Sequence, residues 1–123
     1  MGVPTRSSYV YPDVSVVCGR PILEDATQDV LLNPSLVAEV LSPATRAYDL
    51  GRKLDLYRAH STLAAIVLVE TPRRLVFVHE RAPGTDRWAL IAFADPALTI
   101  DTLGLTVPLD DVYAGVTFDA SAT

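Results

Sequence analysis

The chain alternates apolar segments of strand length with polar connections, and one longer segment has helical periodicity. Residues 35–42, "SLVAEVLS", are apolar on both faces except for Glu39, which is typical of a central strand covered on both sides. The residues that follow predict a helix from Thr45 to Ala59, with Thr45 as its N-cap. A strand over residues 11–18 comes first, so the chain begins with two strands and a helix.

The rest of the pattern predicts further strands. Three apolar segments, separated by short polar connections, indicate an antiparallel meander over residues 63–70, 74–80 and 87–94. Residues 104–116 predict a short strand and one helical turn. The helix is expected to bury a stripe of apolar positions, which are Ala47, Leu50, Leu54 and Tyr57. Together these elements predict a mixed α/β (α+β) domain, in which the main helix packs on one face of a mixed sheet.

Length and composition suit a single domain. Of the 123 residues, 50% are apolar and 20% are charged, which is enough for one compact hydrophobic core. We expect a flexible N-terminus over residues 1–8, the domain over 9–118 and a C-terminal tail over 119–123. No apolar segment reaches the roughly 18 residues that span a bilayer, and no secretory signal is present, so we expect a cytoplasmic protein. Cys18, the only cysteine, is expected to be a small buried residue.

The net charge of -5 changes the range of functions to consider. An acidic protein lacks the electrostatic signature of one that coats nucleic acid without specificity. Carboxylates can nevertheless hold metal ions, and the bound cations then reverse the local sign of the field. The overall charge therefore leaves a metal-dependent enzyme acting on nucleic acid open.

Two carboxylates fall at unusual places in the apolar pattern. Asp13 follows Pro12 within the first predicted strand, although both residues are poor strand formers. Glu39 shares a strand face with Val37 and Leu41, where an unpaired ionised carboxylate would be costly. We therefore expect a compensating partner for Glu39.

Lys53 is the candidate partner. Glu39 lies about 10 Å back from the end of a strand that rises ~3.3 Å per residue. Lys53 lies about 12 Å into a helix that rises ~1.5 Å per residue. If the helix folds back over the sheet, the two distances nearly match, which places the Lys53 amine near the Glu39 carboxylate.

These side chains fit a site for metal-assisted chemistry. Mg²⁺ takes oxygen ligands, often from one or two carboxylates, and keeps its other positions for water and phosphate. Asp13 and Glu39 would supply the carboxylates, and the backbone carbonyl of Val40 a third oxygen. Lys53 would position the attacking water or neutralise charge in the transition state.

Each residue also has a structural explanation. Asp13 can cap backbone groups at the start of a strand. Glu39 can form a structural ion pair with Lys53 or with an arginine. Lys53 can pair with Asp49, which precedes it by four residues on the same helix. The residues alone leave these alternatives open.

Three segments together resemble a known family. They are "YPD" at residues 11–13, "EVLSPAT" at 39–45 and "YDLGRKLDLY" at 48–57. This combination resembles the PD-(D/E)XK nuclease superfamily, and within it the Uma-two family of restriction endonucleases. The superfamily usually carries its lysine two residues after the acidic residue, a position that Leu41 occupies here. The sequence is similar to the branch in which the lysine has moved to the next helix.

The resemblance implies a restriction-endonuclease-like core, dependence on Mg²⁺ (or Mn²⁺) and hydrolysis of DNA phosphodiester bonds. Asp13, Glu39 and Lys53 match the active-site positions of the family. Three further residues match accompanying positions, namely Ser42, Asp49 and Tyr57. The DNA-hydrolysing function is thus an expectation drawn from the family and from the residues that match it.

One departure from the family bears on assembly. Members usually carry a further N-terminal region ahead of the segment with which this chain begins. We therefore expect a sheet edge or an apolar face that is left uncovered, and a homodimer is one way to cover it. The alternative function is a non-catalytic interaction or oligomerisation domain that retains the nuclease fold.

Overall fold

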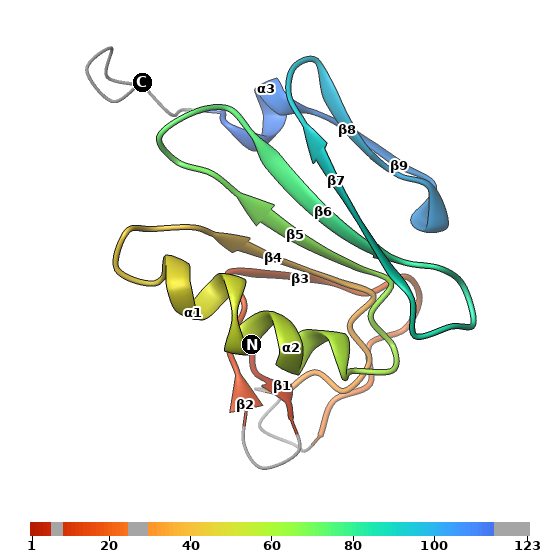
Figure 1. Cartoon of the computed structure of the whole chain (residues 1–123). Coiled ribbons are helices and arrows are strands. Elements are labelled where there is room, and N and C mark those ends of the chain that lie inside the picture. The colour runs from red at the N-terminus through yellow and green to blue at the C-terminus, as the bar shows by residue number, and fades with distance from the viewer. Residues whose placement is uncertain (6–8, 25–29, 115–123) are drawn as a thin grey trace.

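A five-stranded mixed sheet forms the centre of the molecule (Figure 1). The computed structural model describes residues 1–5, 9–24 and 30–114. In sheet order the strands are β3 (Val14–Val16), β4 (Leu36–Val40), β5 (Ala65–Val69), β6 (Val76–Arg81) and β7 (Trp88–Phe93). Only β4 and β5 run parallel, and the other neighbours are antiparallel. The predicted meander, with its order of strands, is confirmed.

Two short helices connect the parallel strands and cross one face of the sheet (Figure 1). They are α1 (Arg46–Leu50) and α2 (Arg52–Arg58), where the sequence predicts one helix. The interruption is at Gly51, whose φ of -110° and ψ of -100° are not helical. A Cβ at this position would lie 3.0 Å from the Ala47 carbonyl oxygen, so the close approach favours glycine.

The sheet has a hydrophobic cluster on each face. The helix-side cluster contains Val37, Leu41, Leu54, Tyr57, Ile66 and Leu68 among others. The predicted helical stripe is right for Leu54 and Tyr57 but wrong for Ala47 and Leu50, which are exposed. The helix instead turns Asp49 toward the sheet, because polar side chains occupy the space over the end of β4.

The second face is covered by the C-terminal segment. Its elements are β8 (Ala97–Ile100), a 3₁₀ turn η1 (Asp101–Leu103), β9 (Leu105–Pro108) and α3 (Leu109–Val112). The predicted short strand and helical turn correspond to β9 and α3. The strand β8, which pairs antiparallel with β9, was not predicted from the sequence. The Tyr113 hydroxyl donates to the carbonyl of Glu70 at 2.7 Å and so joins this segment to the sheet.

The described part of the N-terminal segment contains two short strands. The strand β1 (Val3–Pro4) pairs antiparallel with β2 (Tyr9–Val10). Within the segment that is expected to be flexible, Val3 of β1 is buried in the helix-side cluster.

The remaining predictions concern the first strand, Cys18, the C-terminal tail and helices that could span a membrane. The first predicted strand shortens to β3, and Cys18 is exposed rather than buried, because it lies beyond the end of that strand. Residues 6–8 and the predicted tail at 119–123 lie outside the described residues. In the part of the chain that is described, every helix is too short or too polar to cross a bilayer.

Candidate active site

Asp13 lies beside Glu39 because of the register between β3 and β4. Val14 pairs with Ala38, so the antiparallel register continued by one residue places Asp13 opposite Glu39. The Oδ2 atom of Asp13 accepts a hydrogen bond from the Val40 backbone N–H at 2.7 Å. The carboxylate thus takes the place of a backbone acceptor where β3 has not yet begun, which explains why the strand accepts an aspartate there.

Glu39 lies on the helix-facing side of β4 and is only 3% exposed. The Lys53 amine is 2.7 Å from its Oε1 atom, so the structure brings together the pair that strand and helix geometry predicts. The Tyr57 hydroxyl donates a second hydrogen bond to the same Oε1 atom at 2.5 Å. Both contacts are to Oε1, and neither occupies Oε2.

A chain of polar contacts extends from Lys53 to the start of α1. Lys53 Nζ lies 3.8 Å from Asp49 Oδ1, and Asp49 Oδ2 accepts a hydrogen bond from the Thr45 hydroxyl at 2.9 Å. The hydroxyls of Ser42 and Thr45 are 2.9 Å apart, and Ser42 Oγ accepts from the Thr45 N–H at 3.2 Å. Thr45 is therefore the N-cap residue by position, but its hydroxyl is directed to Asp49. The predicted accessory residues Ser42, Asp49 and Tyr57 all belong to this network.

Burial dominates the electrostatics of the site. It raises the pKa of Glu39, while the hydrogen bonds from Lys53 and Tyr57 act in the opposite direction. Burial and the neighbouring Glu39 carboxylate raise the pKa of Tyr57 far above its usual value. The Tyr57 hydroxyl therefore keeps its proton at neutral pH and remains a hydrogen-bond donor to Glu39.

A second ion pair, which was not predicted from the sequence, lies at the same edge of the sheet. Arg46 Nη1 contacts Glu70 Oε1, and Glu70 is only 3% exposed. The strands β4 and β5 are parallel, and Val40 pairs with Val69. Glu70 therefore lies beside Leu41, just after the carboxyl ends of the two strands. The position of a glutamate at the end of a buried strand was the signal that could have indicated this pair.

The site offers oxygen donors of the kind that hard cations prefer. Within the described residues, no group of three or more His, Cys, Asp or Glu side chains gathers as a metal cage. Two carboxylates, those of Asp13 and Glu39, do lie at adjacent positions. This number suits Mg²⁺, which is commonly held by one or two carboxylates and completed by other oxygens.

Most of the chain matches the sequence model of a known protein family. The sequence model of the Uma2 family, described as "Putative restriction endonuclease", matches residues 1–110. The chain belongs to the Uma2 family. The resemblance seen in the motifs is confirmed, and the Uma2 match includes all the residues of the candidate site.

Two proteins of Synechocystis sp. are similar to this Uma2 chain. The uncharacterized protein slr1290 is 35% identical over 117 residues, which cover 94% of this chain and 60% of that protein. The uncharacterized protein sll1609 is 40% identical over 68 residues, which cover 55% of this chain and 38% of that protein. The Uma2 chain therefore spans less than two thirds of the length of either relative.

A solved structure shares the fold. A crystal structure from Anabaena variabilis, described as a putative nuclease belonging to DUF820, superposes with a TM-score of 0.68 at 17% identity. The match covers 92% of this chain and 64% of that chain. The Uma2 chain thus has a nuclease-like fold, as predicted.

Proposed function

We propose that this Uma2 domain is a metal-dependent endonuclease that hydrolyses DNA phosphodiester bonds. Asp13 and Glu39 would hold Mg²⁺ or Mn²⁺, and Lys53 would assist the attacking water. One observation carries the proposal: Glu39 contacts Lys53 at 2.7 Å, and Asp13 is hydrogen-bonded to the peptide that follows Glu39. Membership of the Uma2 family and the nuclease-like fold support it.

The backbone around Val40 supports a third oxygen ligand. The Leu41 N–H bonds to the Val69 carbonyl on β5. Successive residues of a strand direct their backbone groups to opposite sides, so Val40 presents its N–H and its C=O toward Asp13. The Val40 carbonyl would then lie on the same side as the Asp13 carboxylate, next to Glu39.

The other residues of the site would position these groups. Lys53 carries the positive charge that stabilises an ionised Glu39, and its amine has two further protons with which to orient water or a phosphate oxygen. Tyr57 holds Glu39 Oε1 and leaves Oε2 to face the ligand. A bound divalent cation would supply Lewis-acid stabilisation of the negative charge on the phosphodiester. Asp49, beside Lys53, would limit the range of positions that its amine adopts.

A structural role for the same network is the competing function. Glu39 is buried and already compensated by Lys53 and Tyr57, which is the arrangement expected of a structural ion pair. The domain would then serve interaction or oligomerisation while retaining the nuclease fold. Asp13 distinguishes the two functions, because it is exposed and a structural pair between Glu39 and Lys53 does not require it.

The test is a plasmid nicking assay with Mg²⁺ or Mn²⁺. Wild-type protein should convert supercoiled plasmid to open-circular and linear forms, and chelation of the metal should abolish this. Asp13→Asn, Glu39→Gln and Lys53→Met should each lower the rate by about 100-fold or more, since each removes charge that is needed at the reacting phosphate. Asp13→Asn is the most informative variant, because an asparagine oxygen can still accept the hydrogen bond from Val40.

Asp86→Asn is the matched control. Asp86 is an exposed carboxylate in the connection between β6 and β7, outside the candidate site. Its Oδ1 atom lies 3.5 Å from Arg81 Nη1. This variant should cleave at the wild-type rate. Equal cleavage by all four variants would indicate a contaminating nuclease. A folded wild-type protein that cleaves with neither metal would favour the non-catalytic function.

A further inference from the structure

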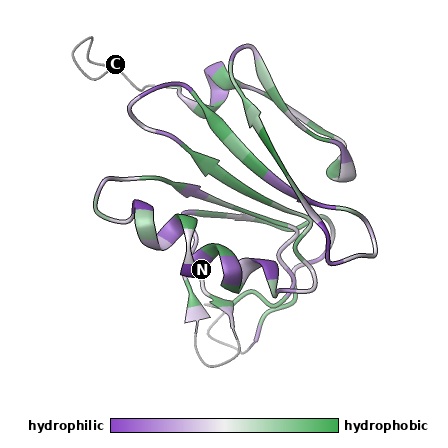
Figure 2. Cartoon of the chain, in the orientation of Figure 1, coloured by the Kyte–Doolittle hydropathy of each residue, from purple (hydrophilic) through white to green (hydrophobic). Residues whose placement is uncertain are grey.

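Among the described residues, no strand pairs with the outer side of β7, which is therefore an edge of the sheet (Figure 1). Its six residues, "WALIAF", include no charge and no proline. Leu90 is 58% exposed and Ile91 is 46% exposed, and Figure 2 shows the strand largely in the hydrophobic colour. Edge strands of soluble proteins usually carry charges, prolines or bulges, or are very short. The other edge, β3, has only three residues, whereas β7 lacks all of these protections.

The backbone of β7 has hydrogen-bonding groups that point away from the sheet. The Ala82 N–H bonds to the Arg87 carbonyl, which fixes the residues whose backbone groups face β6. By the alternation of a strand, these residues are Ala89, Ile91 and Phe93. The residues that direct their N–H and C=O groups outward are Trp88, Leu90 and Ala92. The edge thus offers three evenly spaced donor and acceptor pairs.

The sequence of β7 is complementary to itself. A second β7 strand, placed antiparallel about a two-fold axis at Leu90, brings the outward backbone groups of both strands into register. On the helix side, Trp88 of one copy lies opposite Ala92 of the other. On the second face, Ile91 lies opposite Ala89. Large side chains therefore meet small ones on both faces, and only Leu90 meets its own equivalent.

The charges that flank the strand are compatible with the same arrangement. Arg87 precedes β7 and Asp95 follows it, and both are exposed. Antiparallel pairing brings the Arg87 end of one strand to the Asp95 end of the other. The Asp95 carboxylate already binds Arg74 of its own chain, so the alternation of large and small side chains, more than the flanking charges, favours pairing of two identical strands over pairing with an unrelated apolar strand.

We propose that β7 is a homodimer interface, through which two copies of this chain join their sheets into one continuous sheet. Hydrogen bonds from Trp88, Leu90 and Ala92 to the second copy would satisfy the edge, and the exposed Leu90 and Ile91 side chains would be buried. This inference is independent of the proposed nuclease activity, because the candidate site lies on β4, next to the opposite edge strand of the sheet.

Sedimentation velocity on the full chain tests the interface. Wild-type protein should sediment with twice the mass of one chain at micromolar concentration. Leu90→Lys and Leu90→Glu should each sediment as a monomer, because the pairing places two like charges directly opposite one another. Leu90 is exposed in the monomer, so circular dichroism should show that both variants are folded.

An equimolar mixture of Leu90→Lys and Leu90→Glu tests the register. Residue 90 lies opposite residue 90 of the other copy only in the proposed register, so the mixture should recover the dimer that each variant alone has lost. Failure of the mixture to dimerise would overturn this register.

Val16→Lys is the control, since Val16 is an exposed apolar residue on the opposite edge strand. This variant should stay dimeric. A monomeric wild type would overturn the interface, as would dimers of Leu90→Lys. Dissociation by Val16→Lys in place of Leu90→Lys would assign the interface to β3. None of these results depends on cleavage of DNA.

Discussion

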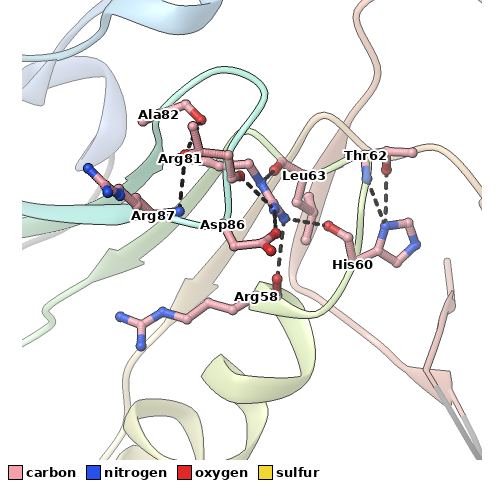
Figure 3. Close-up of polar contacts among 9 residues, drawn as sticks. Arg58, His60, Thr62, Leu63, Arg81, Ala82, Asp86 and Arg87 are labelled. Atoms are coloured by element: carbon pink, nitrogen blue, oxygen red, sulfur yellow. Dashed lines mark hydrogen bonds and ion pairs between the residues drawn. The ribbon is translucent and has the colours of Figure 1, made fainter.

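Two clusters of polar side chains lie between the helices and the sheet, and they differ in what holds them. The carboxylate cluster, at the end of β4, consists of Asp13, Glu39, Asp49, Lys53 and Tyr57. Its internal contacts are mainly between side chains, such as the ion pair between Lys53 and Glu39. The arginine cluster, at the C-terminal end of α2, has Arg81 at its centre and is held mainly by backbone carbonyls (Figure 3).

Arg81 on β6 binds three backbone carbonyls of the segment that leads from the end of α2 to β5. Its guanidinium donates to the carbonyls of Leu63 at 2.8 Å, Arg58 at 3.2 Å and His60 at 2.7 Å, and it lies 4.5 Å from the Trp88 ring centre. The carbonyls at the end of a helix lack partners within the helix and carry partial negative charge. Arg81 satisfies these carbonyls where α2 ends, which is a structural role.

The difference separates a functional cluster from a structural one. Backbone carbonyls cannot be replaced without changing the fold, so a cation that they bind is held in one place. Side-chain carboxylates can release one contact and accept another, and Glu39 retains an oxygen beyond its contacts with Lys53 and Tyr57. We therefore expect substitutions in the carboxylate cluster to affect ligand binding, and substitutions in the arginine cluster to affect stability alone.

The largest change in stability is expected from Lys53→Met. Glu39 would be left as a buried carboxylate without its counter-ion, which costs about 3 to 5 kcal/mol in the free energy of unfolding. Urea unfolding at pH 8 measures this loss. The double variant Glu39→Gln/Lys53→Met should recover most of it, because no buried charge remains. Additive losses in the double variant would contradict the ion pair.

The pH dependence of Lys53→Met gives a second measurement of the same pair. A raised pKa of Glu39 means that the folded state binds this proton more tightly than the unfolded state. Its contribution to stability is therefore present at low pH and is lost as pH rises. Without Lys53 the pKa rises further, so the loss of stability relative to wild type should be larger at pH 8 than at pH 5.

Arg81→Met should have the next largest effect. Arg81 is mostly buried, and its loss removes the hydrogen bonds that it donates to the carbonyls of Arg58, His60 and Leu63, which costs about 2 to 3 kcal/mol. Urea unfolding should show this loss, whereas metal binding by the folded variant should equal that of wild type. If Arg81→Met kept the stability of wild type but no longer bound metal, the assignment of a structural role to the arginine cluster would be contradicted.

Much of the carboxylate cluster was predictable from the sequence, whereas little of the arginine cluster was. Glu39 interrupts an apolar strand, and simple rises per residue place Lys53 above it. The arginine cluster leaves no such signal, because its partners are backbone carbonyls, which every residue carries. Arg81 could only be identified once the end of α2 had been placed beside β6.

The fold shows the same division between what a pattern contains and what packing decides. The strands from β4 to β7 follow from their apolar runs. The break at Gly51 and the exposure of Leu50 do not, because they depend on polar groups beneath the helix. The exposure of β7 was not predictable either, because an apolar pattern on both faces is typical of a strand that is covered on both sides.

The smallest effect is expected at His79, at the edge of the arginine cluster. Arg58 Nη2 lies 2.9 Å from His79 Nδ1, and since an arginine can only donate, Nδ1 must be unprotonated. Burial and the nearby Arg58 lower the pKa of His79. Stability from this group is therefore present above pH of about 6.5 and is lost as pH falls.

His79→Gln retains an acceptor for Arg58 and has no charge to gain. Its thermal midpoint should therefore fall less between pH 7.5 and pH 5 than that of wild type. Identical pH profiles for the two proteins would show that His79 is not held in its neutral form.

Binding of Mn²⁺, followed by electron paramagnetic resonance on the folded chain, tests the central claim most directly. Wild-type protein should bind one ion per chain with saturation, and Asp13→Asn and Glu39→Gln should each weaken binding at least tenfold. Asp86→Asn and Arg81→Met should bind as wild type does. The contradictory result is a wild type that shows no saturable binding, or binding that is unchanged in Asp13→Asn and Glu39→Gln.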